Sequence, residues 1–402
     1  MTTVGVRARV RAALDRVLNS AYLSEASPLS FNAAVAPTSA IADGSLSAVL
    51  NVLDAGSSLQ VNAVLDQLSP QVYAELYSQS LSRLQDIQKT VSDRLSALGT
   101  ALVTEGRPEV LASATGVGEE NAMTAWTNTY GSASAHPGNN SLGDQGSSLS
   151  NYGNVSGVER RLGSLALGLL GAVGGGSEQM NLTGARISSD SWHLGLYMSS
   201  PLFWRLFLDV SGFYGEGDST IRRTQNIPGV GVFQSREKAM TQEWLMQVGM
   251  GAQLASASAG WSVVPSIRIA HAGMRQNRIS ESGMGSLGIK TDAAVQGTFI
   301  SRMGLEVANE WRLGRLPVRT SGNVAWVHDF DSKPRMVGVR WDGAPDVPWA
   351  ISSGKQTSDA MRAGFSLEVG LGDRRTLRLY GEQEFLQGSK VLRGGVSYTI
   401  GF

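Results

Sequence analysis

The segment MTQEWLMQVGMGAQLASASAGWSVVPSIRIAHAGMRQ, residues 240–276, contains two stretches in which apolar and polar residues alternate. One face of the first stretch carries apolar side chains, namely Trp244, Met246, Val248, Met250, Ala252 and Leu254. The opposite face carries Glu243, Gln247, Gly249, Gly251 and Gln253. A period of two residues indicates a β-strand with two unlike faces. The short connection SASAG between the stretches therefore predicts an antiparallel hairpin.

The same alternation recurs from about residue 120 to the end of the chain. It predicts twelve strands, at 122–131, 149–161, 164–175, 184–199, 202–216, 240–255, 261–276, 293–311, 316–330, 358–371, 375–386 and 391–402. The connections after the even strands up to the tenth are short. Those after the odd strands up to the ninth are longer and polar, at 132–148, 176–183, 217–239, 277–292 and 331–357. Only the last hairpin, LQGSK, departs from this trend.

An even number of strands with alternating short and long connections is typical of transmembrane barrels, whose short turns are periplasmic and whose long loops are extracellular. We therefore predict an all-β fold, a 12-stranded antiparallel up-and-down transmembrane β-barrel. Charged residues in the middle of strands are costly in lipid. We expect such residues to face a wet lumen, and the candidates are Arg205, Gln247, Arg268, Arg302, Arg319 and Glu368.

Six tryptophans lie near the ends of predicted strands. Trp204, Trp261 and Trp311 are beside short turns, whereas Trp192, Trp244 and Trp326 are nearer the long loops. Transmembrane barrels carry aromatic girdles at both membrane interfaces. We interpret these residues as two interfacial girdles, with chance placement of aromatic residues in strands as the alternative.

The composition excludes several other classes of protein. Lys and Arg total 34, as do Asp and Glu, so there is no basic excess of the kind that nucleic-acid binding needs. The chain has no cysteine, which rules out disulfides and cysteine-based zinc sites. Glycine accounts for 48 of the 402 residues, above its usual ~7%, and no run of 18 apolar residues indicates a transmembrane helix. We expect no cofactor and no metal.

A helix is predicted before the strands. Ser69 as N-cap and Pro70 in the first turn start it, and Gly99 ends it, so that it covers about 70–98. At ~1.5 Å per residue it is about 43 Å long, close to the thickness of a bilayer. Its polar face includes Arg83, Lys89, Asp93 and Arg94, which we expect to meet lumen residues of opposite charge. The alternative is a surface helix on a soluble domain.

These patterns divide the chain into three parts. Residues 1–60 are a residual passenger or linker region, helical or poorly ordered, 61–115 are a linker with the lumen-threading helix, and 116–402 are the barrel. The basic N-terminus is followed by AALDRVLNSAYLSEAS, which charge interrupts, so it is no secretory signal. Because an outer-membrane protein must be exported, we expect that the natural N-terminus is missing.

The chain ends in GGVSYTIGF, residues 394–402. A terminal phenylalanine on an alternating strand resembles the signal that the barrel-assembly machinery of the outer membrane reads. The residues that carry this resemblance are Gly395, Val396, Tyr398, Ile400 and Phe402. A lipid-facing closing strand accounts for the same pattern, and both interpretations are compatible.

Taken in order, these motifs resemble the autotransporter (type V secretion) β-domain family. The resemblance covers roughly 40–402 and is carried by LNVLDAGSSLQVNAVLDQLSPQVYAELYSQS, TAWTNTYGS, VSGVERRLGSLALGLLGAVGGGS, HLGLYMSSPLFWRLFLDVSGFYGEGD, NVAWVHDF and LRLYGEQEFLQGS. It implies a monomeric barrel in the outer membrane of a Gram-negative bacterium, surrounded by outer-membrane lipids and threaded by a helix. It also implies that the barrel secretes its own N-terminal passenger. No β-helical passenger repeat lies in 1–60, so the cargo is absent from this sequence.

The predicted function is therefore that of a translocator, with a porin-like or ligand-binding barrel partly closed by the helix as the alternative. We expect no enzymatic activity. The triplet 217–219 and the pair His328–Asp329 look like fragments of hydrolase sites, but each lacks the partners that catalysis needs. The triple glycine at 174–176 precedes more strand, which argues against a phosphate loop. Some family members cleave the helix beside paired asparagines, and 70–98 contains no such pair, so we do not expect that reaction.

Overall fold

The computed structural model describes residues 58–104, 110, 123–138, 144–254, 261–333, 335–353, 357–372, 374–386 and 388–402, and seven single positions before residue 58. Most of the predicted passenger region 1–60, and most of the linker between residues 104 and 123, lie outside the described residues.

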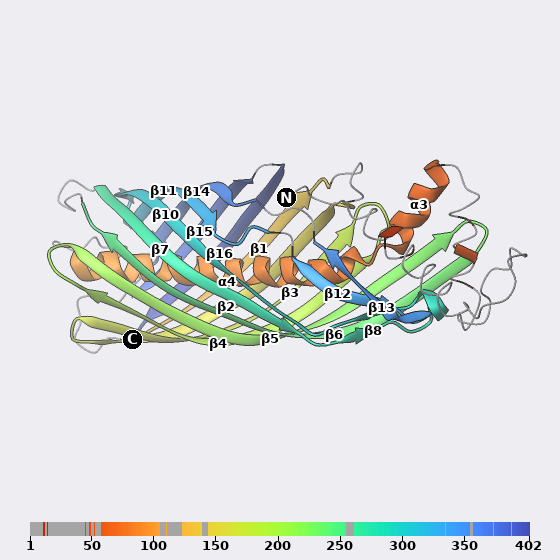
Figure 1. Cartoon of the computed structure of the whole chain (residues 1–402). Helices are drawn as coiled ribbons and strands as arrows, with labels where there is room; N and C mark the ends of the chain where they lie inside the picture. The colour runs from red at the N-terminus through yellow and green to blue at the C-terminus, as the bar shows by residue number, and fades with distance from the viewer. Residues whose placement is uncertain are drawn as a thin grey trace, which may run out of the picture.

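Twelve strands form one closed antiparallel barrel (Figure 1). They are β1 (Met123–His136), β2 (Ser147–Leu162), β3 (Leu165–Met180), β4 (Arg186–Pro201), β5 (Leu206–Ile227), β6 (Gly231–Ala252), β7 (Trp261–Gln276), β10 (Ala294–Leu313), β11 (Leu316–Asp329), β14 (Asp359–Gly370), β15 (Arg375–Leu386) and β16 (Ser389–Gly401). Each pairs with its neighbour along the chain, and β1 pairs with β16 to close the wall. The predicted fold class is confirmed.

The main error in the strand prediction is the connection 217–239, which is strand rather than loop. β5 continues to Ile227 and β6 starts at Gly231, so only three residues form the turn. In this extension the apolar side chains, such as Ile221 and Ala239, point inward, while the outward face is polar. The extension therefore lacks the apolar outer face by which the other strands were recognised.

A second, four-stranded sheet occupies two other predicted loops. It has the order β13-β12-β9-β8, with β8 (Ile279–Ser280) and β9 (Ile289–Thr291) from the first loop and β12 (Met336–Trp341) and β13 (Ala344–Ser352) from the second. A short 3-10 helix, η2 (Gly285–Leu287), lies between β8 and β9. Trp341 of β12 and Trp349 of β13 pack against each other on this sheet, with ring centroids 4.8 Å apart.

This sheet belongs to an apolar unit that we call the cap. The cap consists of the four-stranded sheet, helix α3 (Ser58–Leu68) and the extended ends of β5 and β6, all at the long-loop end of the barrel (Figure 1). Its core includes Leu68, Ile221, Ile289 and Trp341, each at most 1% exposed. The cap therefore has its own core beyond the barrel wall.

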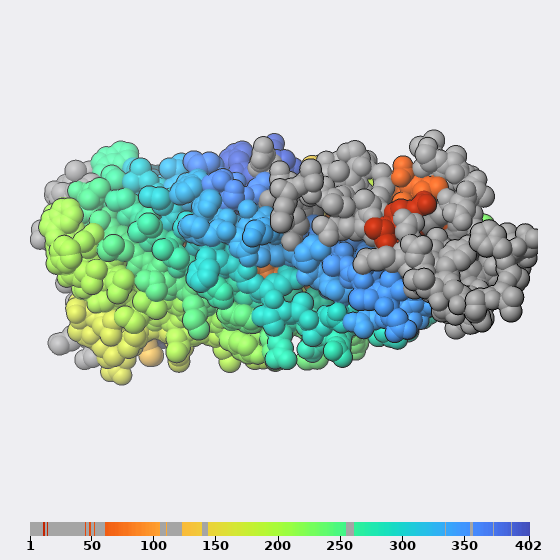
Figure 2. Space-filling model, in the orientation of Figure 1, coloured from red at the N-terminus to blue at the C-terminus, as the bar shows by residue number. Residues whose placement is uncertain are grey.

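Helix α4 (Gln71–Val103) runs through the barrel from the cap to the end with the short turns (Figure 1). It begins at Gln71 with Pro70 at the N-cap and no side-chain cap, so the prediction that Ser69 caps it is wrong. The space-filling view shows only scattered atoms of α4 between the strands (Figure 2). No described helix is long and apolar enough to span a membrane.

The predicted end of this helix at Gly99 is also wrong, because the helix continues for four more residues to Val103. A Cβ on Gly99 would lie 2.2 Å from Cδ2 of Phe207, a buried residue of β5. The glycine thus permits close contact between helix and wall rather than a change of backbone direction. Gly168 of β3 permits a similar close contact within the wall, where a Cβ would lie 2.1 Å from the ring of Tyr197 on β4.

The core of the cap predicts that it unfolds separately from the barrel. Trp341→Ala should leave a cavity that costs ~3–5 kcal/mol and should speed amide hydrogen exchange in α3, β12 and β13. Exchange in β14 to β16 should stay unchanged. Trp204→Ala, at a residue 72% exposed, is the control and should change neither. Equal acceleration throughout the barrel would contradict a separate cap.

Candidate functional site

The charged residues of α4 are buried inside the barrel, and Arg83 illustrates how they are paired. Its guanidinium forms a salt bridge with Glu243 of β6, with Nε 3.2 Å from Oε2, and both side chains are at most 1% exposed. His193 lies 3.0 Å from the same carboxylate, and Arg83 Nη1 donates to Ser189 Oγ at 2.9 Å. The helix is thereby joined to β4 and β6.

A second pair lies about three turns further along the helix. Nε of Arg94 donates to Glu159 of β2 at 3.0 Å. The Tyr197 hydroxyl also donates to Glu159, at 2.8 Å, and Trp126 Nε1 donates to that hydroxyl at 2.6 Å. These hydrogen bonds hold the carboxylate in place opposite the guanidinium.

The remaining predicted charges of the helix face the other side of the lumen. Lys89 Nζ lies 3.0 Å from Asp93 and 3.5 Å from Glu382 of β15, and it stands over the ring of Tyr380. Arg378 Nη2 lies 3.1 Å from Asp93. All four predicted residues of the polar face therefore lie against opposite charges on the wall.

One functional charge of the helix was missed in the sequence. Asp86 receives Nε of Arg393 at 2.8 Å, Ser132 Oγ at 2.6 Å and Asn151 Nδ2 at 3.2 Å, so it connects β16, β1 and β2. It lies three residues after Arg83 and three before Lys89, a spacing that places all three near one face of a helix. This spacing could have identified Asp86 as a lumen-facing charge from the sequence alone.

The candidate lumen residues occupy different surroundings. Gln247 accepts hydrogen bonds from Gln88 and Ser92 of the helix, at 2.8 and 3.0 Å. Arg268 donates to Ser96 at 2.7 Å and to Asp209 at 3.0 Å. The other lumen pairs lie on the wall itself, where Arg319 is 3.1 Å from Glu306 and Arg302 is 3.9 Å from Glu382.

The placement of Arg205 in the middle of a strand is wrong. The residue lies in the turn between β4 and β5, because β5 begins only at Leu206. Its backbone carbonyl accepts a hydrogen bond from Gln253 N of the neighbouring connection at 3.0 Å. Arg205 is therefore at the short-turn end of the wall and not in its middle.

The two halves of the lumen differ, whereas a uniformly wet lumen was expected. The apolar face of α4 packs against β1 to β7 in one continuous cluster. Its helix members are Leu84, Ile87, Val91, Leu95 and Leu98, and its wall members include Trp126, Val155, Leu170, Phe213, Leu245 and Ala272. The half of the wall formed by β10 to β16 carries the charged residues Arg302, Glu306, Arg319, Arg362, Glu368, Arg378, Glu382, Glu384 and Arg393. The half formed by β1 to β7 also carries charged residues, but these are buried and paired, namely Glu159, Asp209, Glu243 and Arg268. We call these two surfaces the dry half and the charged half.

A small polar cavity lies between α4 and the charged half. Its volume is about 60 Å³, and its lining includes Asp93, Glu306, Arg319, Glu368 and Arg378. A cavity of this size holds only a few water molecules. With the helix in place, this cavity therefore leaves room beside the helix for only a few water molecules.

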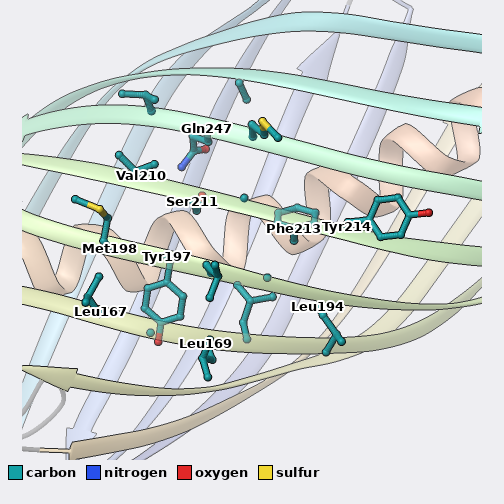
Figure 3. A pocket seen from close by; sticks show the side chains of 18 of the residues that line it. Leu167, Leu169, Leu194, Tyr197, Met198, Val210, Ser211, Phe213, Tyr214 and Gln247 are labelled. Carbon is teal, nitrogen blue, oxygen red and sulfur yellow. The ribbon is translucent and has the colours of Figure 1, made fainter.

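The outer surface of the barrel is apolar around its middle from β3 to β16, whereas β1 and β2 carry Thr127, Thr129, Asn154 and Ser156 there. Leu169, Leu194, Met246 and Val248 are between 54% and 67% exposed. Figure 3 shows Leu167, Leu169 and Leu194 on the strands of the wall, with α4 behind them. This surface forms a broad hollow lined almost entirely by apolar side chains, as expected of a wall in contact with lipid.

The predicted girdle residues are on this outer surface. At the short-turn end Trp204, Trp261 and Trp311 are 72%, 53% and 43% exposed, and towards the long loops Trp192 and Trp326 are 44% and 39% exposed. Trp244 is half-buried because its ring lies over Gly273 of β7. Their role at the membrane interfaces stays a prediction.

The residues of the predicted assembly signal lie in or directly after β16 at the short-turn end. Phe402 is 59% and Val396 45% exposed on the outer face, which Tyr398 and Ile400 share. Gly395 points to the lumen, where a Cβ would lie 2.6 Å from the Tyr380 hydroxyl. Recognition of this strand by another protein stays a prediction.

The other sequence motifs do not form a catalytic site in the described residues. His328 Nδ1 lies 3.0 Å from Asp359, whereas Asp329 accepts a hydrogen bond from Thr298. The triplet 217–219 belongs to strand β5, not to a loop. Among the described residues no group of three or more His, Asp or Glu is arranged to hold a metal ion.

One ionic contact lies beyond the apolar belt, at the long-loop end of β1. Nε2 of His136 is 3.3 Å from Asp144, and this hydrogen bond raises the pKa of His136. Burial alone would raise the pKa of Asp144, but hydrogen bonds from His136, Gln71 and Gly146 lower it. Nε2 of Gln71 donates to Asp144 at 2.9 Å. Because Gln71 is the first residue of α4, this hydrogen bond joins the helix to the loop.

Comparison with models of protein families identifies the family of this chain. A model of the autotransporter β-domain matches residues 125–382. The structure is similar to the translocator domain of the autotransporter NalP from Neisseria meningitidis, with 13% identity, a TM-score of 0.61, and coverage of 83% of this chain and 99% of that one. It is also similar to the β-domain of the Bordetella autotransporter Brka, with 16% identity, a TM-score of 0.52, and coverage of 70% and 100%. A search of curated proteins finds no match.

The buried pair Arg94–Glu159 predicts how the helix is retained. Arg94→Met leaves Glu159 buried without its cation, which typically costs ~3–5 kcal/mol. The fraction of time that single barrels conduct in a planar bilayer should rise by roughly a hundredfold or more. The double variant Arg94→Met/Glu159→Gln should return towards the original value. If the single and double variants both behave like the original chain, the pair does not hold the helix.

Proposed function

This chain belongs to the autotransporter β-domain family, and we propose that the two unlike halves of its lumen serve the export of one attached polypeptide. It is an outer-membrane translocator barrel of a Gram-negative bacterium. Family membership implies a covalently linked passenger and a barrel embedded in the membrane.

Closure of the wall is the first requirement for this function. A strand inserted in lipid without partners leaves backbone groups unsatisfied, each at a cost of several kcal/mol. In this barrel β1 and β16 pair from Thr124 with Gly401 to Ala135 with Lys390, so the described wall has no free edge. The apolar outer face faces lipid and leaves the lumen as the hydrated route.

The division of the lumen carries the proposal. The dry half binds the apolar face of α4, whereas the charged half offers ions and hydrogen-bonding groups to a backbone that passes along it. We infer that an extended passenger moves beside the charged half while the segment that becomes α4 settles on the dry half. When export ends, the four charged residues of the predicted polar face bind their partners and the helix remains as a plug.

A porin-like barrel is the alternative. A solute channel needs a continuous aqueous path, but the helix spans the lumen and the cavity at its charged side measures only about 60 Å³. The apolar outer hollow faces lipid and offers almost no polar group to orient a solute. Both features favour a plugged translocator over a resting channel.

Three further points belong to the same proposal. The barrel has no enzymatic activity of its own, as is usual for transporters of this family. The barrel-assembly machinery reads the last strand through Gly395, Val396, Tyr398, Ile400 and Phe402. The barrel works as a monomer among outer-membrane lipids, because the outer face of the wall from β3 to β16 is apolar.

The test compares the chain of 402 residues with a shortened chain that starts near residue 115, each reconstituted in planar bilayers. The translocator with its helix should be nearly closed, and the shortened barrel should open widely, because the lumen loses the helix from Gln71 to Val103. Equal conductance of the two chains would contradict the plug. A reporter fused before residue 1 that fails to reach the cell surface, despite a correctly inserted barrel, would contradict export.

A further inference from the structure

The extended ends of β4, β5 and β6 carry a row of arginines on their outer face. Arg186 pairs in register with Arg222, and Arg222 pairs with Arg236, so the three lie side by side across three strands. All three are exposed, as are Lys238, one step nearer the barrel, and Arg275 on β7. We call these five residues the basic row.

The basic row has little compensation within the chain. Arg186 donates to Ser177 Oγ at 2.8 Å, but none of the five forms an ion pair with another described residue. Like charges directly opposite each other on neighbouring strands destabilise a sheet. A bound anion removes this repulsion, and the arginine fork suits the oxygen atoms of phosphate.

The heights of these basic residues above the membrane identify the anion. Trp192, Glu216, Gln242 and Arg275 lie in one cross-strand row at the level of the girdle. The three arginines are six residues further out, which is about 20 Å along the strands and about 15 Å in height for strands tilted by ~40°. Phospholipid headgroups add only about 5–8 Å to each side of the hydrocarbon core. Phospholipid phosphates therefore reach Arg275 but not Arg186, Arg222 and Arg236.

We propose that the basic row binds an anionic glycolipid of the outer leaflet whose phosphates are carried at two heights. Phosphates next to the acyl chains meet Arg275, and phosphates on sugars further out meet Arg186, Arg222 and Arg236. Between the two levels lie the carboxylates of Asp190 and Asp218, which face each other across β4 and β5. These carboxylates repel phosphate and accept hydrogen bonds from sugar hydroxyls. The order of basic, acidic and again basic side chains along the strands therefore matches a phosphorylated oligosaccharide.

This inference rests on the outer-membrane location and does not depend on export. Binding of the glycolipid lets the long β5–β6 hairpin orient the cap. With its base in the girdle and its arginines in the sugar layer, the hairpin holds the cap at a set height above the bilayer.

The test uses the complete chain in a neutral detergent and measures the binding of purified phosphorylated lipid A–core glycolipid by native mass spectrometry. The probes for comparison are the same glycolipid after removal of its phosphates and inorganic phosphate alone. Arg222→Gln/Arg236→Gln is the test variant. Arg315→Gln/Arg375→Gln is the matched control, because both residues are exposed at the short-turn end.

The original chain should bind the phosphorylated glycolipid roughly tenfold more tightly than the dephosphorylated form, with affinity falling as salt rises. The test variant should lose roughly this tenfold preference while the control variant keeps it, both with the β-content of the original. Equal binding of the two glycolipids, or the same loss in the control, would overturn the proposal. So would displacement of the glycolipid by equimolar inorganic phosphate, because the site would then be one for a free anion.

Discussion

The pairing of buried charges between α4 and the barrel wall is the constraint on which the rest of the structure depends. Lipid covers the outer face, so a charged side chain on this helix needs either water or an opposite charge inside the lumen. The structure supplies opposite charges at several heights, with Glu243 for Arg83, Arg393 for Asp86 and Glu159 for Arg94. Pairs on strands so far apart in the wall determine both the rotation of the helix and its depth.

Apolar contact adds to these pairs mainly on one side, with Leu81 against Ile300 and Val327 as the contact on the other. Leu84, Ile87, Val91, Leu95 and Leu98 all face the dry half, where glycines let large rings lie flat against the wall. The charged half keeps its ions in contact with one another, as in Arg319 with Glu306 and Glu310. One lumen therefore combines a binding surface for a helix with a hydrophilic surface for a moving chain. At its outer end the cap packs Leu68 and Val72 from either side of the start of α4 into a separate core.

The sequence was informative wherever lipid imposes a simple pattern. Alternation with large apolar residues predicted all twelve strands of the barrel, and the predicted bounds of β7 and β15 agree with the structure. The pattern failed beyond the membrane, where 217–239 alternates with the opposite sense because water lies outside and the cap core inside. Gly99 was wrongly predicted to end the helix. A glycine is needed there because of close contact with Phe207, which is far away in the sequence and approaches Gly99 only in the folded barrel. The partners of Arg83 and Arg94 were likewise hidden, since β6 and β2 meet the helix only in the closed barrel.

The most direct test of the central claim, that α4 sits on the dry half, is site-specific crosslinking in intact outer membranes. The chain has no cysteine, so introduced pairs are the only thiols. Ser92 donates to Gln247 of the wall at 3.0 Å, whereas Ser366 lines the far side of the small polar cavity. A short bifunctional thiol reagent should join Ser92→Cys to Gln247→Cys efficiently and should not join Ser92→Cys to Ser366→Cys. Equal crosslinking of the two pairs, or crosslinking of neither, would contradict a helix held against one half of the lumen.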